Sequence, residues 1–435
     1  MKHIGIGLAG FGTVGSGVWN ILRDNGGLIQ DRTGNKFQCE ITKIAIRDLK
    51  KATTAGAPEA LCTTDLLSIV NDPKTDMVVE LIGGTTAAFD LVAAALKAGK
   101  HVVTGNKALL AERGAELFPL AKENDVAIHF EAAVAGGIPI IQAVKDSLVG
   151  NKIESMVGII NGTSNYILER MTLAGLSYQE ALTEAKDLGY AEADPTLDVN
   201  GWDAAHKAIL LTSLAHGFVI DSEKVYVRGI ERVRSIDIKF AKELGYNIKQ
   251  LCVMLKNDEG KVELRAQPSF IPQSHILSSV NGVFNAISVT GDALGESLFY
   301  GRGAGQLPTG SSVVSDIVEV ARGIESGTHR GFQPYVEKSN LVDIDDTETP
   351  YYVRFEVEDR TGVVAKIASE LAKAGIGLSG MHSPVNPDNP DADFQDMVFL
   401  LHTCTFKKLR DTLATIEALD CVKARPTVFR IESFS

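Results

Sequence analysis

The glycine spacing near the start of the chain constrains its fold most strongly. Residues 10–15 have the sequence GFGTVG, which follows the apolar run HIGIGLAG and opens a segment with helical spacing. Between a strand and a helix, glycines at GxGxxG spacing let the backbone approach a pyrophosphate at the helix N-terminus. A tight strand–helix turn without a ligand is the alternative. We expect a dinucleotide site that includes Gly10, Phe11, Gly12, Thr13, Val14 and Gly15.

Strands and helices alternate over the first 130 residues. The apolar runs ITKIAIRD, DMVVELIGG, KHVVTGN and VAIHFEAAV follow the first strand, with helices expected at about 12–23 and 87–98. Such alternation predicts a parallel sheet with helices on both faces, and the apolar strands suit burial on both sides. We therefore expect an α/β fold with a Rossmann-type doubly wound parallel sheet.

The pattern changes after residue 150. Helical segments come first and strands such as IKQLCVMLK and NAISVTGD follow, which predicts an α+β domain with a mixed or antiparallel sheet. A helix at 309–322 is expected to pack back on the first domain. The last segment has a βαββαβ order, which is ferredoxin-like. We expect domains at 1–130, 131–322 and 351–435, with a polar linker at 323–350.

Composition excludes several classes of protein. The net charge of −12 over 435 residues argues against nucleic-acid binding, which normally needs a basic face. No apolar run is long enough to span a membrane, and the first residues do not resemble a signal peptide. Five cysteines without a CxxC pair suggest reduced thiols, and no HExxH-type spacing predicts a transition-metal site. A cytoplasmic protein is expected.

The end of the second expected strand bears on cofactor choice. A dinucleotide site often places an acid here, on the ribose hydroxyl, but this strand ends with Arg47 and then Asp48. Arginine at this position pairs with a 2′-phosphate, which favours NADP. Asp48 leaves NAD open as an alternative.

Residues 190–208 gather acids around one lysine. The acids are Glu192, Asp194, Asp198 and Asp203, and the lysine is Lys207. Asp203 and Lys207 have i, i+4 spacing, so they lie on one face of a helix. A surface ion pair is the simplest interpretation of that spacing. An amino-acid-binding active site is the alternative that we favour.

The segment AKDLGYAEADPTLDVNGWDAAHK resembles the signature of homoserine dehydrogenases. The matching positions are Ala185, Gly189, Asp194, Pro195, Asp198, Gly201, Asp203 and Lys207. With the glycine turn, TGNKAL, NGTSNYIL and GRGAGQLPTG, the resemblance covers roughly residues 1–330. The C-terminal segment is similar to an ACT regulatory domain, although Thr361 replaces the proline usual in its DRPG motif.

This resemblance implies the reversible, NAD(P)-dependent oxidation of L-homoserine to L-aspartate 4-semialdehyde. It implies that Lys207 donates the proton for the developing alkoxide, which suits a lysine, and that Lys107 assists near the nicotinamide. It assigns Glu192, Asp198 and Asp203 to substrate binding and adds Gly303 to the cofactor site. The substrate's ammonium needs such carboxylate partners.

The resemblance also implies a sodium ion at FEAAVAGGIPI, where the second domain begins. Its ligands would be the Glu131 carboxylate and the carbonyls of Val134, Gly136 and Ile138. An acid followed by irregular glycine-rich backbone suits a cation that prefers oxygen ligands. A simple hinge between domains is the alternative, and the two are compatible.

Assembly and regulation follow from the single ACT-like unit. ACT domains pair and bind amino acids at the interface, so one copy per chain implies a homodimer or homotetramer, inhibited by threonine. The turn Gly375-Ile376-Gly377 is expected to contribute to that pocket, or only to cap a helix. Two other functions compete with this one, namely a different two-domain dehydrogenase of a small polar substrate and a non-catalytic amino-acid sensor.

Overall fold

The chain forms two compact units, each assembled from three segments. The computed structural model describes residues 1–328, 331–383 and 394–434. The first unit contains residues 1–162, 203–224 and 283–339, and the second contains 163–202, 225–282 and 340–435. Residues 329–330 of the expected linker, and 384–393 and 435 of the expected C-terminal domain, lie outside the described residues. In the described part, no helix is long and apolar enough to cross a membrane. The expected domain boundaries stay a prediction.

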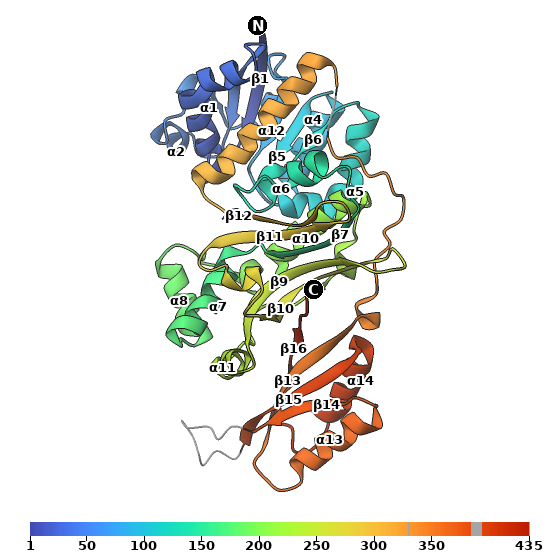
Figure 1. Cartoon of the computed structure of the whole chain (residues 1–435). Helices are drawn as coiled ribbons and strands as arrows, with labels where there is room; N and C mark the ends of the chain where they lie inside the picture. The colour runs from blue at the N-terminus through green and yellow to red at the C-terminus, as the bar shows by residue number, and fades with distance from the viewer. Residues whose placement is uncertain (329–330, 384–393, 435) are drawn as a thin grey trace. The chain divides into compact units, whose positions relative to one another are not determined.

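A six-stranded parallel sheet dominates the first unit (Figure 1). Its strands lie in the order β3-β2-β1-β4-β5-β6. They span Lys2–Ala9 (β1), Phe37–Ala45 (β2), Cys62–Thr63 (β3), Met77–Glu80 (β4), His101–Thr104 (β5) and Ile128–His129 (β6). The connecting helices span Thr13–Arg32 (α1), Leu49–Thr54 (α2), Leu67–Asn71 (α3), Ala87–Lys97 (α4) and Lys107–Glu123 (α5). This strand order is that of a doubly wound dinucleotide-binding sheet, so the expected fold class is confirmed.

Helix α1 is longer than the sequence predicts. We expected an end near Arg23, which is wrong, because the helix continues to Arg32 through Gly26 and Gly27. Glycine in a helix interior costs about 1 kcal/mol relative to alanine. The C-terminal half is held by packing, since Ile29 lies against the hydrophobic core of the sheet. Tertiary contacts therefore override the local preference.

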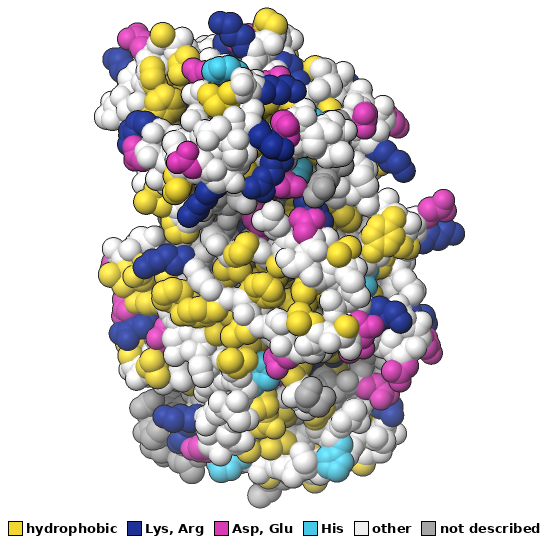
Figure 2. Space-filling model, turned by 45° about the horizontal axis from the view of Figure 1, so that its top comes forward, with side chains coloured by type: hydrophobic (Ala, Val, Ile, Leu, Met, Phe, Trp, Pro, Cys, Tyr) yellow, Lys and Arg dark blue, Asp and Glu magenta, His cyan; other side chains and the backbone are white. Residues whose placement is uncertain are grey.

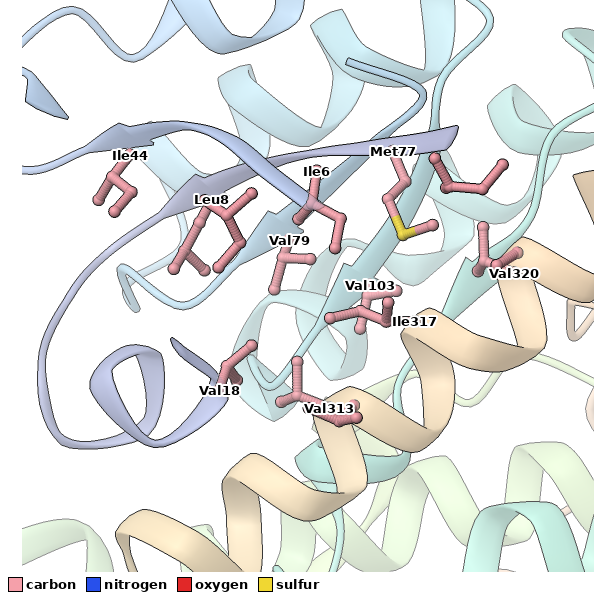
Figure 3. Close-up of a cluster of buried hydrophobic side chains, with 14 of the residues drawn as sticks. Ile6, Leu8, Val18, Ile44, Met77, Val79, Val103, Val313, Ile317 and Val320 are labelled. Atoms are coloured by element: carbon pink, nitrogen blue, oxygen red, sulfur yellow. The ribbon is translucent and has the colours of Figure 1, made fainter. Parts of the chain in front are cut away.

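Helix α12 (Gln306–Ser326) covers one face of the parallel sheet although it lies far away in the sequence. Val313, Ile317 and Val320 belong to the same buried cluster as Ile6 and Val103, as Figure 3 shows. Removing such side chains from water stabilises the fold by about 1.5–3 kcal/mol each. A helix from the third segment of the first unit therefore completes the core of the parallel sheet.

The first unit also contains three antiparallel strands outside the parallel sheet. Its strands β7 (Ile153–Ile159), β11 (Phe284–Gly291) and β12 (Gly295–Arg302) lie in the order β12-β11-β7. Helix α10 (Trp202–His216) is buried along most of its length, and the short helix α6 spans Ile140–Gln142. The antiparallel pairing confirms the expectation of a second, non-parallel sheet.

The second unit combines helices with a mixed sheet. The helices span Gly162–Ala174 (α7), Tyr178–Asp187 (α8), Thr196–Val199 (α9), Ser235–Glu243 (α11), Val363–Lys373 (α13) and Phe406–Glu417 (α14). The strands span Tyr226–Val227 (β8), Tyr246–Lys256 (β9), Val262–Pro272 (β10), Glu348–Glu358 (β13), Leu378–His382 (β14), Phe394–Thr405 (β15) and Thr427–Ile431 (β16). From β13 to β16 the order is βαββαβ, with neighbours β16-β13-β15-β14. The ferredoxin-like segment is confirmed.

Strand β16 continues this sheet onto β10 of the same chain. The two strands pair in parallel at Ser269–Arg430 and Phe270–Ile431. Beside them, Arg265 donates to both carboxylate oxygens of Glu432, at 2.7 and 3.0 Å, and both side chains are buried. Removing one partner of a buried ion pair destabilises the folded protein by about 3–5 kcal/mol, because the other charge stays buried and unpaired. The sequence gives no sign of this connection, because β10 and β16 lie far apart in it.

Candidate active site

Two lysines converge on one aspartate in the first unit. Asp203, at the start of α10, accepts from Lys207 Nζ at 2.6 Å through Oδ2, and its Oδ1 lies 3.0 Å from Lys107 Nζ. Lys207 Nζ also donates to the carbonyl of Ile160 at 2.7 Å. Lys207 is only 8% exposed, so the pair is not the surface ion pair that the spacing alone would favour. The i, i+4 placement on one helix face is confirmed.

The aspartate of this cluster is held in its ionised form. Burial would raise the pKa of Asp203, but the charges of Lys207 and Lys107 lower it well below its usual range. Asn161 adds a hydrogen bond of 2.7 Å from its side-chain amide to Oδ2. Asp203 therefore acts as a fixed negative charge between two lysines.

Lys107 is positioned by a polar network at the carboxyl ends of the parallel strands. Lys107 is the first residue of α5, and the preceding Asn106 caps that helix by accepting from the backbone N–H of Leu109 at 3.1 Å. The backbone N–H of Asn106 donates to the hydroxyl of Thr104 at 3.0 Å. That hydroxyl donates to Glu80 at 2.6 Å. The network fixes where α5 begins and hence where Lys107 lies.

Glu80 connects this network to the neighbouring cavity. Its side chain is fully buried at the end of β4, and its Oε1 accepts from the backbone N–H groups of Ile82 and Gly83, at 2.9 and 3.1 Å. Both residues line the cavity described next. Sequence reasoning missed Glu80 and the role of Asn161. An acid that directly follows an apolar parallel strand, and an asparagine that opens NGTSNYIL, were the available signals.

A cavity with about 1270 Å³ of empty space lies at the glycine turn. Gly10, Phe11 and Gly12 line it, together with Arg47 and Asp48 from the end of β2. The further lining residues are Ala45, Ile46, Thr64, Leu66, Leu81, Ile82, Gly83 and Ala87. This is the carboxyl end of a parallel sheet, where doubly wound folds bind nucleotides.

Backbone conformation and close contacts require glycine at two positions of the glycine turn. Gly10 has a φ of +96°, and a Cβ there would lie 2.6 Å from the carbonyl oxygen of Leu81. A Cβ on Gly15 would lie 2.1 Å from the carbonyl oxygen of Gly10. Around Gly12 the space is open, so the backbone there can be approached closely. Thr13 and Val14 begin helix α1. The turn thus fits the pyrophosphate of a dinucleotide.

Gly303 lies in the loop between β12 and α12, outside the residues that line the cavity. A Cβ on Gly303 would lie 1.7 Å from the side-chain oxygen of Asn285, so any larger residue would force that side chain to move. Directly after this loop, Gln306 at the start of α12 donates through Nε2 to the hydroxyl of Ser16 in α1 at 2.9 Å. The loop is therefore anchored on the helix that follows the glycine turn.

The expected ion ligands lie together in irregular backbone. Glu131 is 2% exposed, and its carboxylate accepts from the backbone N–H groups of Ile141 and Gln142 at 2.9 and 2.8 Å. The carbonyl of Gly136 accepts from Ser312 at 2.7 Å. Burial raises the pKa of Glu131 to about 7, although the two N–H donors oppose that rise.

Val134 ends this irregular turn, and its backbone N–H donates to the Glu131 carbonyl at 3.3 Å. Four residues on, the carbonyl of Ile138 accepts from the backbone N–H of Ile140 at 2.8 Å. No group of three or more His, Cys, Asp or Glu side chains suits a metal ion within the described residues. A site there would depend mainly on backbone carbonyls.

The remaining predicted acids belong to the second unit. Glu192 is exposed before helix α9, and Asp198 lies within that helix, where its carbonyl accepts from the hydroxyl of Ser164 at 2.9 Å. Asp194 accepts from the backbone N–H and the hydroxyl of Thr196 at 3.1 and 2.5 Å. Asp194 therefore stabilises the turn at the start of α9.

Comparisons with known proteins show which family the chain is similar to. The family model described as "Homoserine dehydrogenase, NAD binding domain" matches residues 10–131, and the model described as "Homoserine dehydrogenase" matches residues 139–318. The homoserine dehydrogenase of Neisseria gonorrhoeae is 42% identical, over 100% of this chain and 99% of that protein. That of Pseudomonas aeruginosa is 41% identical, over 100% of each.

Solved structures give the same result. A homoserine dehydrogenase from Thiobacillus denitrificans has a TM-score of 0.91 and 41% identity, covering 99% of each chain. A hyperthermophilic archaeal homoserine dehydrogenase in complex with NADPH has a TM-score of 0.63 and 27% identity, covering 74% of this chain and 98% of that one. With full-length relatives at this identity and both family models matched in order, the chain belongs to the homoserine dehydrogenase family.

Proposed function

We propose that Lys207 is the proton donor and acceptor of an NAD(P)-dependent homoserine dehydrogenase, and that Lys107 assists it. The chain's membership of the family gives the reaction, which interconverts L-homoserine and L-aspartate 4-semialdehyde. The observation that supports the residue assignment is the contact of the half-buried Lys107 and the buried Lys207 with Asp203. A bound nicotinamide supplies or accepts the hydride at the substrate carbon.

The geometry supports a proton transfer by Lys207. An ammonium has three N–H groups, and the contacts with Ile160 and Asp203 use two of them. The third can donate to the aldehyde oxygen as negative charge develops there during reduction. In the oxidation of homoserine, the neutral amine accepts the hydroxyl proton. Asp203 keeps the lysine in place throughout, because its low pKa keeps it ionised.

We propose that NADP is the preferred nicotinamide cofactor and that NAD is used less well. The exposed Arg47 lines the cavity at the end of β2, which supports pairing with a 2′-phosphate. Asp48 lines the same cavity and supports some use of NAD through the ribose hydroxyl. Gly303 is proposed to contribute from its loop next to α12.

We propose that Glu192 and Asp198 bind the substrate ammonium and that Asp203 completes that set. An ammonium taken out of water needs carboxylate or carbonyl partners. A sodium ion bound by Glu131 and by the carbonyls of Val134, Gly136 and Ile138 is proposed as a structural element. The buried carboxylate supports it, since a cation would compensate a charge that is costly to bury. These ligand sets were implied by the family resemblance.

We propose further that the βαββαβ segment mediates assembly into a dimer or tetramer and inhibition by threonine. One edge of its sheet is covered by β10, so the other edge strand, β14, is left for pairing with a second subunit. Gly375 follows helix α13 with a φ of +65°, as in a helix cap, and Gly377 lies beside His402. A cytoplasmic location stays a prediction.

One assay tests the activity and its regulation together. The full chain is supplied with aspartate 4-semialdehyde and either NADPH or NADH, and the loss of nicotinamide absorbance is followed. We expect faster turnover with NADPH and lower turnover when L-threonine is added. Absence of turnover with both cofactors would contradict the activity, and indifference to threonine would contradict the regulation alone. The Gly377→Ala variant should retain turnover and lose sensitivity to threonine.

A further inference from the structure

The edge of β10 has a gap between two short partners. β9 pairs with β10 along its whole length, so the remaining partners share the other edge. There β8 pairs in parallel at Arg265 and Ala266, and β16 pairs in parallel at Ser269 and Phe270. Pro268, which has no N–H to offer a partner, lies in the gap. A hollow with about 650 Å³ of empty space opens at this point.

Three arginines line this hollow. Arg228 and Arg232 lie in the loop after β8, and Arg425 lies just before β16. Glu231 is the single acidic lining residue. Thr427 adds a polar side chain, and Val233, Pro268, Val428 and Phe429 form an apolar floor. Three guanidinium groups thus face one carboxylate around a partly apolar cavity.

These guanidinium groups differ from the other arginines nearby. Figure 2 shows Lys and Arg side chains interspersed with Asp and Glu side chains on one face of the molecule. Near the hollow, Arg234 of the same loop pairs with Asp396 at 2.9 Å. Within the described residues, Arg228, Arg232 and Arg425 make no ion pair with a carboxylate. The three positive charges therefore exceed the one negative charge of Glu231 in the lining.

Local geometry holds the like charges together. The Arg228 guanidinium lies over the ring of Tyr226, 5.5 Å from its centroid, and Arg232 donates to the backbone carbonyl of Arg425. Burial lowers the pKa of Arg232, and the charges of Arg228 and Arg425 lower it further, with a smaller opposing effect from Glu417. Repulsion of this kind is relieved when an anion binds between the groups.

We propose that this hollow is a binding site for a small anion that carries a phosphate group. Arg228, Arg232 and Arg425 would each donate to its terminal oxygens. A phosphate group offers three such oxygens and up to two negative charges, which matches three guanidinium forks better than the two oxygens of a carboxylate. The apolar floor would contact the organic part of a phosphate ester. Free phosphate and a phosphate monoester share this chemistry.

Calorimetric titration of the full chain tests the proposal. Saturating NADP is present so that the nucleotide cavity is occupied, and potassium chloride keeps the ionic strength constant. Inorganic phosphate and glycerol phosphate are the two probes, and the tighter one identifies the source. We expect one saturable site per chain. The affinity for the probe should fall at least tenfold in the double variant Arg232→Gln, Arg425→Gln. Arg410→Gln, an exposed arginine paired with Asp345, is the matched control and should bind as the wild type does.

Three results would overturn the proposal. They are the absence of saturable binding to the wild type, equal binding by the double variant, and binding of succinate as tight as that of phosphate. Turnover without phosphate reports whether the variants fold, since none of these arginines belongs to the proposed catalytic cluster. If the double variant does not fold, the Arg425→Gln variant alone must show weakened binding.

Discussion

The side-chain amide of Asn161 donates a hydrogen bond of 2.7 Å to the same carboxylate oxygen of Asp203 that accepts from Lys207. Asn161 is 3% exposed, and it is not among the residues that line the proposed cofactor cavity. It therefore acts on the reaction through Asp203, as a positioning residue. Hydrogen bonds to charged groups contribute about 1.5–3 kcal/mol.

Replacing Asn161 tests this positioning role. The Asn161→Ala variant should lose about tenfold to a hundredfold in kcat, because Asp203 no longer has a fixed orientation toward Lys207. The KM for NADPH should stay unchanged. An unchanged KM would show that the cofactor site is intact and that the loss in kcat does not come from unfolding. Steady-state kinetics measure both quantities. The Asn340→Ala variant removes an exposed amide and should match the wild type. A KM that rises together with the loss in kcat would contradict the role.

Removal of the Lys207 ammonium should stop turnover in both directions. Loss of a general acid typically costs about a hundredfold to ten-thousandfold. The Lys207→Ala variant should still bind NADP, because Lys207 does not line the cofactor cavity. The measurements are kcat in each direction and the dissociation constant for NADP from fluorescence.

Lys122, near the end of α5, offers a matched control. It is exposed, and Lys122→Ala should leave both quantities unchanged. If the Lys207→Ala variant retained near wild-type turnover, the lysine would be structural and another group would have to supply the proton.

We expect Arg47 to determine the preference for NADPH over NADH. The Arg47→Ala variant removes the cation from the cavity end at β2 and should raise the KM for NADPH at least tenfold. The KM for NADH should change little, because NADH carries no 2′-phosphate. Parallel kinetics with both cofactors measure the ratio. If the two constants moved together, Arg47 would have no phosphate contact and the NADP preference would be wrong.

Sodium should stabilise the fold through Glu131. We expect a higher Tm in sodium chloride than in choline chloride at equal concentration, because an ion that binds only the folded state stabilises it. The Glu131→Gln variant should show the same Tm in both salts. Thermal unfolding followed by circular dichroism measures the difference. A Tm of the wild type that does not depend on the cation would contradict the ion site.

The sequence predicts those parts of the fold that depend on local pattern. Apolar runs and the GxGxxG turn predict the parallel sheet, and the alternation from β13 to β16 predicts the ferredoxin-like segment. Long-range pairing has no such signature. The parallel contact of β16 with β10, and the ion pair of Arg265 with Glu432, join segments that are far apart in the chain. A truncation before β13 would leave Arg265 buried without its partner, so regulation is better tested on the full chain.

The residues of the candidate site also fall into those that the sequence predicts and those that it does not. Spacing on one helix places Lys207 next to Asp203, and this could be predicted. The donation from Asn161 and the network of Glu80 could not, because they depend on how separate elements pack. Sequence reasoning therefore finds groups that share an element more readily than groups that orient them from another one.

The stability of the chain should depend on pH through Lys249 of β9. Lys249 is 3% exposed and donates to the carbonyl of Val280 at 2.6 Å and to the side chain of Asn165 at 3.1 Å. Burial lowers its pKa from 10.5 to about 8. The unfolded chain therefore still binds this proton between pH 8 and about 10.5, whereas the folded chain has released it, so stability rises with pH in that window. At about 1.4 kcal/mol per pH unit, the gain is about 3 kcal/mol.

Urea unfolding at pH 7.5, 9 and 10 measures the free energy of unfolding of the wild type and of Lys249→Met. The difference between the two should grow in favour of the wild type as pH rises. The Lys239→Met variant removes an exposed lysine and should show no such trend. A difference that is constant with pH would show that Lys249 titrates alike in the folded and unfolded chain.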